Sequence, residues 1–231
     1  MPNHKDIYLS EAQRYHALIS REDYQNKLLP GILSITPLHG KDVLELGAGT
    51  GRISLQIAPL AKRLILTDVS HHMLRFGKQH LERLNLDNWV MSLESHTDLP
   101  FINNIADVVV AGWSFCYAAI NAGVNWESAL ERALLEINRV IRPGGFVLLI
   151  ESLGTGFESP HRPDILMDYL ASLEKHGFES TWIRTDYQFK DRVEARELTG
   201  FFFGEAPMPM WETETGVIVP ECTGLWWKKF D

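Results

Sequence analysis

The stretch that decides the fold runs Val43-Leu44-Glu45-Leu46-Gly47-Ala48-Gly49-Thr50-Gly51. An apolar, β-prone run ends in three glycines spaced two residues apart, and Glu45 lies two residues before the first of them. The apolar residues that follow have helical spacing, so the segment predicts a strand, a tight turn and a helix. Glycine permits positive φ angles and lets a ligand approach the main chain, and the free N–H groups of the helix start face that ligand. The segment is therefore typical of a nucleotide-type binding turn.

The glycine spacing argues against two common nucleotide sites. A dinucleotide fingerprint has its third glycine where Arg52 stands here, and no Gly-Lys-Ser/Thr of a P-loop follows the turn. Glu45 also argues against a phosphate, because a carboxylate at the end of the first strand repels a polyanion and suits an ammonium or hydroxyl groups. An ordinary glycine-rich turn is the alternative to a ligand site.

The pattern Glu-x-Gly-x-Gly-x-Gly resembles motif I of the class I S-adenosylmethionine-dependent methyltransferases. The cofactor of that family has no phosphate and carries an ammonium and a sulfonium. It therefore suits both the early third glycine and the carboxylate of Glu45. Two later segments, Leu99-Pro100-Phe101 and Arg142-Pro143-Gly144-Gly145, are also similar to family signatures, so the resemblance spans about residues 40 to 152. It is strongest to the group that contains the quinone-biosynthesis C-methyltransferases and many small-molecule methyltransferases.

The resemblance implies a set of cofactor contacts. An acid at the end of the second strand accepts ribose hydroxyls in dinucleotide-binding folds, and Asp68 ends that strand here; the alternative is a helix cap, for which Ser70 is the better candidate. In this group an acid four residues before Leu-Pro-Phe lies beside the adenine, but Ser95 occupies that position here. Glu94, next to Ser95, is a candidate for the adenine contact, and Asp98 is a weaker one. The predicted cofactor-binding residues are Glu45, Gly47, Ala48, Gly49, Gly51, Asp68, Val69, Met73, Glu94, Ser95, His96, Gly112, Trp113 and, from the N-terminal side, Tyr24.

Strands alternate with helices from residue 41 to 152, which predicts an α/β fold with a doubly wound, mostly parallel sheet. The resemblance implies a Rossmann-like sheet of seven strands, the last antiparallel. We expect a single methyltransferase domain over 1–231, with a helical cap (1–40), a cofactor-binding core (41–152) and C-terminal strands with a helical insertion (153–231). In the last part, 180–189 is predicted as one strand, 192–203 as a helix, 205–216 as a loop and 222–227 as the last strand.

A general base is harder to identify than the cofactor site. His161 and Glu158 lie in the loop after the fifth strand, and a histidine there suits proton transfer near neutral pH; the alternative is a solvated surface loop. Tyr117 belongs to an alternating run, Trp113, Phe115 and Tyr117, after the fourth strand. These rings either face the sulfonium or pack in the core. His71 and His72 do not make a metal site, because adjacent helical residues point in different directions, and we expect no metal.

An apolar run in the insertion bears on the acceptor. Phe201–Phe203, Met208, Met210 and Trp211 either line a pocket for an apolar substrate or dock the insertion on the sheet. We expect an enclosed, largely apolar cavity beside the sulfur, between the 113–117 segment, the N-terminal helix and this insertion.

Composition narrows the function further. A net charge of −8 over 231 residues argues against a nucleic-acid partner, which requires a basic surface. The two cysteines make no disulfide framework, the first 27 residues are polar, and no apolar run is long enough to span a bilayer, so we expect a cytoplasmic protein. The resemblance implies methyl transfer from S-adenosyl-L-methionine to a small or medium-sized organic molecule. The alternatives are a methyltransferase-fold binding or regulatory protein without catalysis, and a nicotinamide-dependent oxidoreductase. The oligomeric state is open.

Overall fold

The computed structural model describes residues 3–205 and 207–231. Its α-helices are α1 (His4–Ser10), α2 (Ala12–Ile19), α3 (Leu28–Ile35), α4 (Ser54–Ile57), α5 (His71–Glu82), α6 (Cys116–Ile120), α7 (Trp126–Val140), α8 (Met167–Lys175) and α9 (Arg192–Phe203). Its strands are β1 (Asp42–Leu46), β2 (Arg63–Asp68), β3 (Trp89–Leu93), β4 (Ala106–Gly112), β5 (Ile141–Thr155), β6 (Glu179–Arg184), β7 (Tyr187–Phe189), β8 (Trp211–Thr213), β9 (Gly216–Val219) and β10 (Glu221–Lys229).

Seven strands form the main sheet in the order β3-β2-β1-β4-β5-β10-β6. The first five pair in parallel, and β10 runs antiparallel to both of its neighbours. The strand order reverses between β1 and β4, and the carboxyl ends of strands at such a point are where open α/β sheets bind ligands. The predicted fold class, with its antiparallel last strand, is confirmed.

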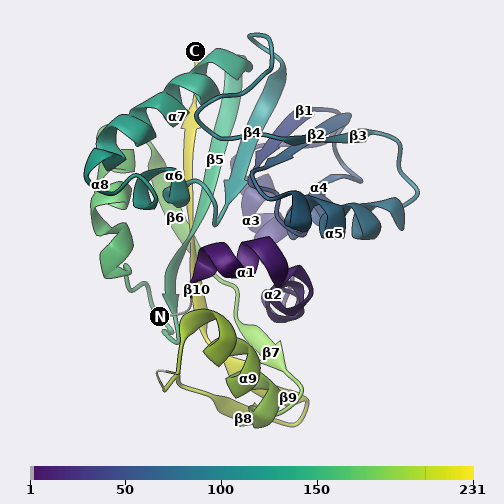
Figure 1. The fold of residues 1–231 in the computed structure, drawn as a ribbon, viewed down its shortest axis with the longest axis vertical. Helices are drawn as coiled ribbons and strands as arrows, with labels where there is room; N and C mark the ends of the chain where they lie inside the picture. The colour runs from purple at the N-terminus through teal and green to yellow at the C-terminus, as the bar shows by residue number, and fades with distance from the viewer. Residues whose placement is uncertain (1–2, 206) are drawn as a thin grey trace.

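Strand periodicity explains the layers of helices on the two faces of the sheet. In β4, Val109 and Ala111 pack in the apolar cluster that contains residues of α6, α7 and α8, whereas Val108 and Val110 pack with residues of α3, α4 and α5. Successive strand side chains point to opposite faces, so a strand covered on both sides is apolar at every position. Figure 1 shows the two layers on either side of the sheet.

The C-terminal insertion differs from its prediction. Residues 180–189 form two strands in different sheets, β6 at the edge of the main sheet and β7 in a small sheet of order β7-β9-β8. The strand is interrupted at Thr185 and Asp186, because both residues hydrogen-bond Glu221. The Thr185 N–H donates to the Glu221 carbonyl oxygen at 3.0 Å, and the Asp186 carboxylate accepts from the Glu221 N–H at 3.0 Å. The predicted loop at 205–216 contains β8 and the start of β9. The prediction of one strand and one long loop was wrong there.

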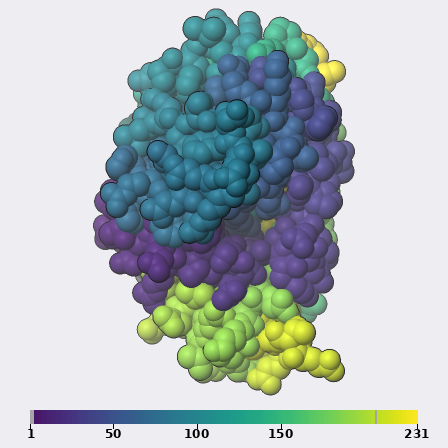
Figure 2. Space-filling model, turned by 90° about the vertical axis from the view of Figure 1, so that its right-hand side faces the viewer, coloured from purple at the N-terminus to yellow at the C-terminus, as the bar shows by residue number. Residues whose placement is uncertain are grey.

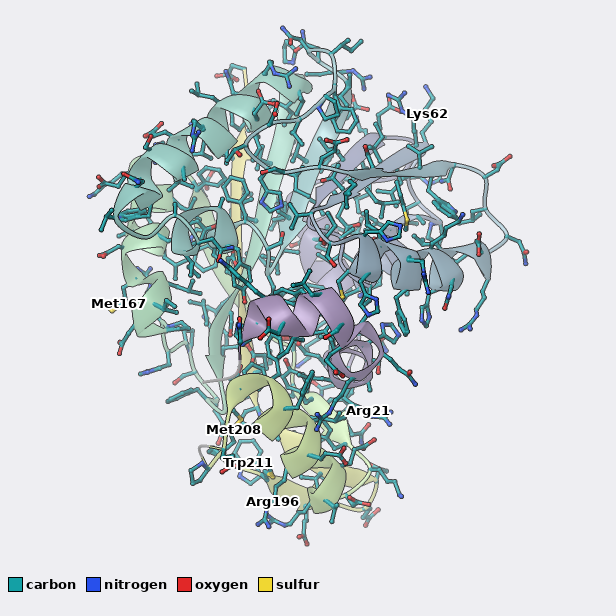
Figure 3. The ribbon with its side chains drawn as sticks, viewed as in Figure 1. Arg21, Lys62, Met167, Arg196, Met208 and Trp211 are labelled. Carbon is teal, nitrogen blue, oxygen red and sulfur yellow. The ribbon has the colours of Figure 1, made fainter. Side chains whose placement is uncertain are left out.

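The N-terminal helices α1 and α2 lie between the main sheet and this small sheet (Figures 1 and 2). The Ser70 hydroxyl, just beyond β2, donates to the carbonyl oxygen of Tyr8 at 2.6 Å. Arg21 lies at the junction with the small sheet (Figure 3), where its guanidinium pairs with Glu194 at 2.7 Å. The helices therefore form a roof over the carboxyl ends of the strands.

The apolar run of the insertion mainly docks the small sheet. Four residues of the run, Phe202, Phe203, Met208 and Met210, pack with Ala17 against a buried cluster from α2, α9 and the small sheet. The members of that cluster are Leu18, Tyr187, Phe189, Ala195, Leu198, Val217 and Val219. Figure 3 shows Met208 and Trp211 in the region of the small sheet and α9. Phe202 also reaches the N-terminal roof, where its ring stacks on His4 with centroids 4.5 Å apart. Within the two described ranges, no helix is both long and apolar enough to cross a membrane.

Candidate cofactor site

The glycine turn has the backbone that the sequence predicts. Gly47, Gly49 and Gly51 have φ angles of +70°, +56° and +92°. A side chain at Gly47 would overlap Ser114, so this glycine is required for packing. A Cβ at Gly49 would meet nothing within 4 Å. The main chain at Gly49 is therefore open to a ligand, which a strand–turn–helix made only for packing does not require.

Asp68 holds this turn from the end of β2. One of its carboxylate oxygens accepts from the Gly49 N–H at 2.8 Å and the other accepts from the Ser70 N–H at 2.7 Å. Ser70 caps α5, because its hydroxyl accepts from the Met73 N–H at 3.2 Å. Asp68 is therefore not the helix cap. Each carboxylate oxygen can accept more than one hydrogen bond, so both remain available to ligand hydroxyls beside the open main chain of Gly49.

Glu45 is the buried acid of the site, with 2% of its surface exposed. Burial raises the pKa of its carboxyl group to about 8, the nearby Asp68 charge raises it further, and the Ser54 hydroxyl, which donates at 2.6 Å, opposes the rise. A carboxyl group in this state holds a proton at neutral pH and gives it up when a cation comes beside it. It therefore suits a ligand that carries an ammonium.

The roof contacts the turn directly. His16 on α2 hydrogen-bonds the Thr50 hydroxyl through Nδ1 at 3.1 Å, and its ring lies 4.2 Å from that of His80 on α5. Burial lowers the pKa of His16 to about 4. Arg52, directly after the last glycine, forms an ion pair with the buried Glu22 of the α2–α3 loop. The turn is therefore held from below by β2 and from above by the N-terminal segment.

The three aromatic residues after β4 separate into different roles. Trp113 has a φ of +50°, a strained conformation for a side chain of its size, and the Arg52 guanidinium carbon lies 3.3 Å from its ring centroid. One face of Trp113 is thus already covered by a cation. Phe115 is fully buried in the core. Tyr117 is half-buried and reaches the roof, where its hydroxyl hydrogen-bonds Tyr8.

The region predicted to hold the adenine lies at the ends of β2 and β3. The Glu94 N–H donates to the Asp68 carbonyl oxygen at 3.0 Å, so Glu94 lies next to Asp68, the residue predicted to bind the ribose. His96 stacks on Phe115 with ring centroids 5.8 Å apart, and burial lowers its pKa to about 4. Ser95 is exposed. Glu94 and His96 therefore remain the candidates for the adenine contact.

The remaining predicted positions fall in several environments. The Ala48 N–H donates to the Thr67 carbonyl oxygen at 2.8 Å and so fixes the start of the turn. Met73 is buried beneath it, whereas Val69 is 70% exposed beside it. A side chain at Gly112 would overlap Ile53, so this glycine lets α4 approach β4.

Two predicted contributions from loops lie away from the turn's own contacts. Tyr24 is 37% exposed; its N–H donates to the Asp186 carbonyl oxygen at 3.4 Å, and its hydroxyl accepts from Gln25. Glu158 and His161 are both exposed, and the His161 ring stacks on Phe157 with centroids 4.1 Å apart. Of the three candidate bases, only Tyr117 is brought against the N-terminal roof.

Three features of the site were missed from the sequence. The first is the Arg52–Glu22 pair, and the second is Tyr8 in the roof. The third is Gly77, where a Cβ would lie 3.0 Å from the Gly49 carbonyl oxygen, so the lack of a side chain lets α5 pack against the turn. A glycine in the middle of a helical apolar pattern was the available signal for the third. Among residues 3–205 and 207–231, no three His, Cys, Asp or Glu side chains gather in a way that could hold a metal ion.

Comparison with known proteins found relatives of this chain in both sequence and fold. Residues 44–149 match the family model described as "Methyltransferase domain". The ubiquinone/menaquinone biosynthesis C-methyltransferase UbiE of Blochmanniella floridana is 30% identical over 151 residues, which cover 59% of this chain and 56% of that protein. The chain spans about half the length of the curated relatives that it matches.

Solved structures agree with this fold. The YcgJ protein of Bacillus subtilis has a TM-score of 0.57 at 14% identity, covering 89% of this chain and 98% of that one. The N-methyltransferase NodS of Bradyrhizobium japonicum, solved with S-adenosyl-L-homocysteine, has a TM-score of 0.54 at 14% identity, covering 89% and 84%. These likenesses concern the fold, whereas the match over 44–149 concerns the sequence. The sequence match over 44–149 and the likeness in fold together support a relation of this chain to the class I S-adenosylmethionine-dependent methyltransferases.

Proposed function

We propose that this protein transfers a methyl group from S-adenosylmethionine to a small organic acceptor. The observation that carries the proposal is the turn at Gly49, whose main chain is open on one side, whose N–H donates to the Asp68 carboxylate, and which follows the buried Glu45 in the chain. When bound, the cofactor supplies an electrophilic methyl group on its sulfonium. The protein's own residues then have to bind the cofactor, orient the acceptor, exclude water and remove a proton where the acceptor carries one.

The residues present fit this cofactor group by group. Asp68 would accept the ribose hydroxyls, Glu45 would pair with the ammonium, and Glu94 or His96 would contact the adenine. Asp68 and Glu45 are acids that would repel a pyrophosphate, so these two residues do not suit a dinucleotide. The C-methyltransferase UbiE of Blochmanniella floridana and the N-methyltransferase NodS of Bradyrhizobium japonicum, to which the chain is similar, support the same assignment.

The size of the acceptor follows from the roof. Helices α1 and α2 cover the carboxyl ends of the strands and contact the turn, so the reacting centre lies beneath protein rather than on an open face. The net charge of −8 disfavours a polyanionic partner. We therefore propose a small molecule as the methyl acceptor. The cytoplasmic location and the enclosed apolar cavity beside the sulfur stay predictions.

Calorimetric titration with S-adenosylhomocysteine tests the proposal. We expect a dissociation constant in the micromolar range, about −8 kcal/mol, and a higher melting temperature with ligand. Titration with NAD is the comparison, and binding of NAD alone would favour an oxidoreductase. Formation of S-adenosylhomocysteine from S-adenosylmethionine with an acceptor present would exclude a binding protein without catalysis. Absence of heat and of a thermal shift at millimolar S-adenosylhomocysteine would contradict the proposal.

A further inference from the structure

Three side chains from distant parts of the chain form a hydrogen-bonded row under the roof. The Tyr8 hydroxyl of α1 donates to the Tyr117 hydroxyl of α6 at 3.2 Å, and the Tyr117 hydroxyl lies 3.1 Å from Nδ1 of His4. His4 Nε2 lies 3.0 Å from the carbonyl oxygen of Phe202 on α9. All three side chains are half-buried.

The direction of this row follows from hydrogen-bond chemistry. A carbonyl oxygen only accepts, so Nε2 of neutral His4 carries the proton and donates it to Phe202. Nδ1 is then the acceptor, which makes Tyr117 its donor and leaves the Tyr117 oxygen to accept from Tyr8. In the part of the chain that the structure describes, the Tyr8 oxygen accepts no hydrogen bond. The row therefore has one open end, the lone pairs of the Tyr8 hydroxyl.

That open end is beside the reacting centre of the proposed function. The main chain of Tyr8 is held just beyond β2 by Ser70, and its side chain is held by Tyr117 of α6, the helix that follows β4. Strand β1, which carries the glycine turn, lies between β2 and β4 in the sheet. Tyr8 is thus fixed from both sides of the strand that carries the glycine turn, and the proposed function places the reacting centre at that turn.

We propose that Tyr8, Tyr117 and His4 form a proton relay that deprotonates an aromatic hydroxyl acceptor. As the acceptor oxygen forms its bond to the methyl carbon, its O–H bond breaks and the proton moves to the Tyr8 oxygen. The Tyr8 proton moves to the Tyr117 oxygen and the Tyr117 proton to Nδ1 of His4. The sulfur keeps the electron pair of the broken S–C bond, so the positive charge that leaves the sulfur is found on the His4 imidazolium. This inference rests on the proposed function.

The surroundings support both the relay and the acceptor class. Burial raises the pKa of Tyr8 and of Tyr117 well above the ordinary value of a phenol, so these hydroxyls pass a proton without standing as anions. The centroid of the Phe202 ring lies 6.5 Å from that of the Tyr8 ring, and an aromatic neighbour of this kind suits a planar acceptor. A neutral amine attacks through its own lone pair and releases its proton to water afterwards, so it needs no built path.

The complex with S-adenosylhomocysteine and 4-nitrophenol tests the relay, because the nitrophenolate absorbance reports ionisation without turnover. At a pH where the free phenol is mostly neutral, we expect the bound phenol to be ionised. Tyr8→Phe, Tyr117→Phe and His4→Gln should each lower the ratio of ionised to neutral bound phenol roughly tenfold, which corresponds to about 1.4 kcal/mol. His4→Gln keeps an oxygen that can accept from Tyr117 but cannot take its proton.

A second readout follows the proton itself. In ¹⁵N-labelled protein we expect His4 to carry its proton on Nε2 before the phenol is added, and on both nitrogens afterwards. Tyr15→Phe is the matched control: it removes a hydroxyl from the same cleft without interrupting the row, so the ionised fraction of bound phenol should not change. If Tyr8→Phe fails to fold, the phenol ionisation in His4→Gln and the NMR signal of His4 in the wild-type protein decide the question.

The outcomes are distinct. Equal ionisation in all variants would mean that the cleft alone stabilises the phenolate, which would overturn the relay. Failure of the phenol to bind to the S-adenosylhomocysteine complex would overturn the aromatic hydroxyl class and favour an amine. Failure of S-adenosylhomocysteine itself to bind would count against the proposed function rather than against the relay alone.

Discussion

The sharpest prediction concerns the proton on Glu45, tested with the substitution Glu45→Gln. The side chain is 2% exposed, and burial raises the pKa of its carboxyl group to about 8 from an ordinary value of 4.5. Glutamine has nearly the same volume and keeps an oxygen for the Ser54 hydroxyl, which donates at 2.6 Å in the wild-type protein. The substitution therefore removes the titration and little else.

The magnitude follows from proton linkage. The folded-state pKa lies above the unfolded value, so the stability that Glu45 contributes is present below about pH 4.5 and is lost as the pH rises through about 8. At 1.36 kcal/mol per pKa unit, the wild-type protein has lost about 3 kcal/mol of this contribution at pH 7. We expect ligand-free Glu45→Gln to be more stable than the wild type at pH 7 by up to that amount. The difference between the two should grow from pH 5 to 8 in denaturant unfolding.

The same proton should appear when the cofactor product binds. An ammonium beside Glu45 favours the carboxylate, so binding of S-adenosylhomocysteine at pH 7 should release close to one proton, and almost none at pH 9. Calorimetry in two buffers of different ionisation enthalpy measures this number. Glu45→Gln should release none from this position and bind about tenfold to a hundredfold more weakly, because a charge-assisted contact of about 1.5–3 kcal/mol is lost.

A second buried acid provides the control. Burial raises the pKa of Glu151 to about 7; its carboxylate accepts from the Cys116 N–H and the Tyr169 hydroxyl, outside the contacts of the glycine turn. Glu151→Gln should alter the pH dependence of stability and leave proton release on binding unchanged. If wild-type binding releases no proton at pH 7, and Glu45→Gln has wild-type stability from pH 5 to 8, then Glu45 is already ionised in the free protein. That result would refute the reasoning.

Three further predictions concern the turn. Asp68→Ala should weaken S-adenosylhomocysteine binding by roughly tenfold to a hundredfold in calorimetry, and unchanged affinity would show that Asp68 only positions Gly49. Gly49→Ala and Gly40→Ala each place a Cβ at a positive φ with no other atom within 4 Å, so both should lower the free energy of unfolding by a similar amount, roughly 1–3 kcal/mol. Only Gly49→Ala should abolish binding of S-adenosylhomocysteine. Gly77→Ala should weaken binding without touching ligand, because its Cβ would displace the Gly49 carbonyl; wild-type affinity there would show that the turn tolerates a shift.

The core fold was predictable because its signals are local. Runs such as 106–112 are apolar at every position, as strands covered on both faces must be, and the helix start at Arg192 is marked by Asp191, whose carboxylate accepts from Val193 and Glu194 N–H groups. The break between β6 and β7 was not predictable. Its two halves share one alternating pattern, and the division depends on their pairing with β10 and β9, which the pattern does not contain.

The candidate site divides in the same way. The glycine turn was predictable because its φ requirements are satisfied by glycine at fixed spacing within nine residues. The roof was not, because its contacts join positions far apart in the chain: His4 is separated from Tyr117 by 113 residues and from Phe202 by 198. Helical periodicity predicts which face of α1 is apolar, but it does not predict which tyrosine that face meets.

The cofactor turn and the proposed relay share one support, and this links binding to catalysis. Thr50 and Arg52 lie within or next to the turn, and both hold the N-terminal segment, through His16 and Glu22. The same segment carries His4 and Tyr8. Any adjustment of the turn on cofactor binding is therefore transmitted to the open end of the relay, because α1 and α2 rest on it.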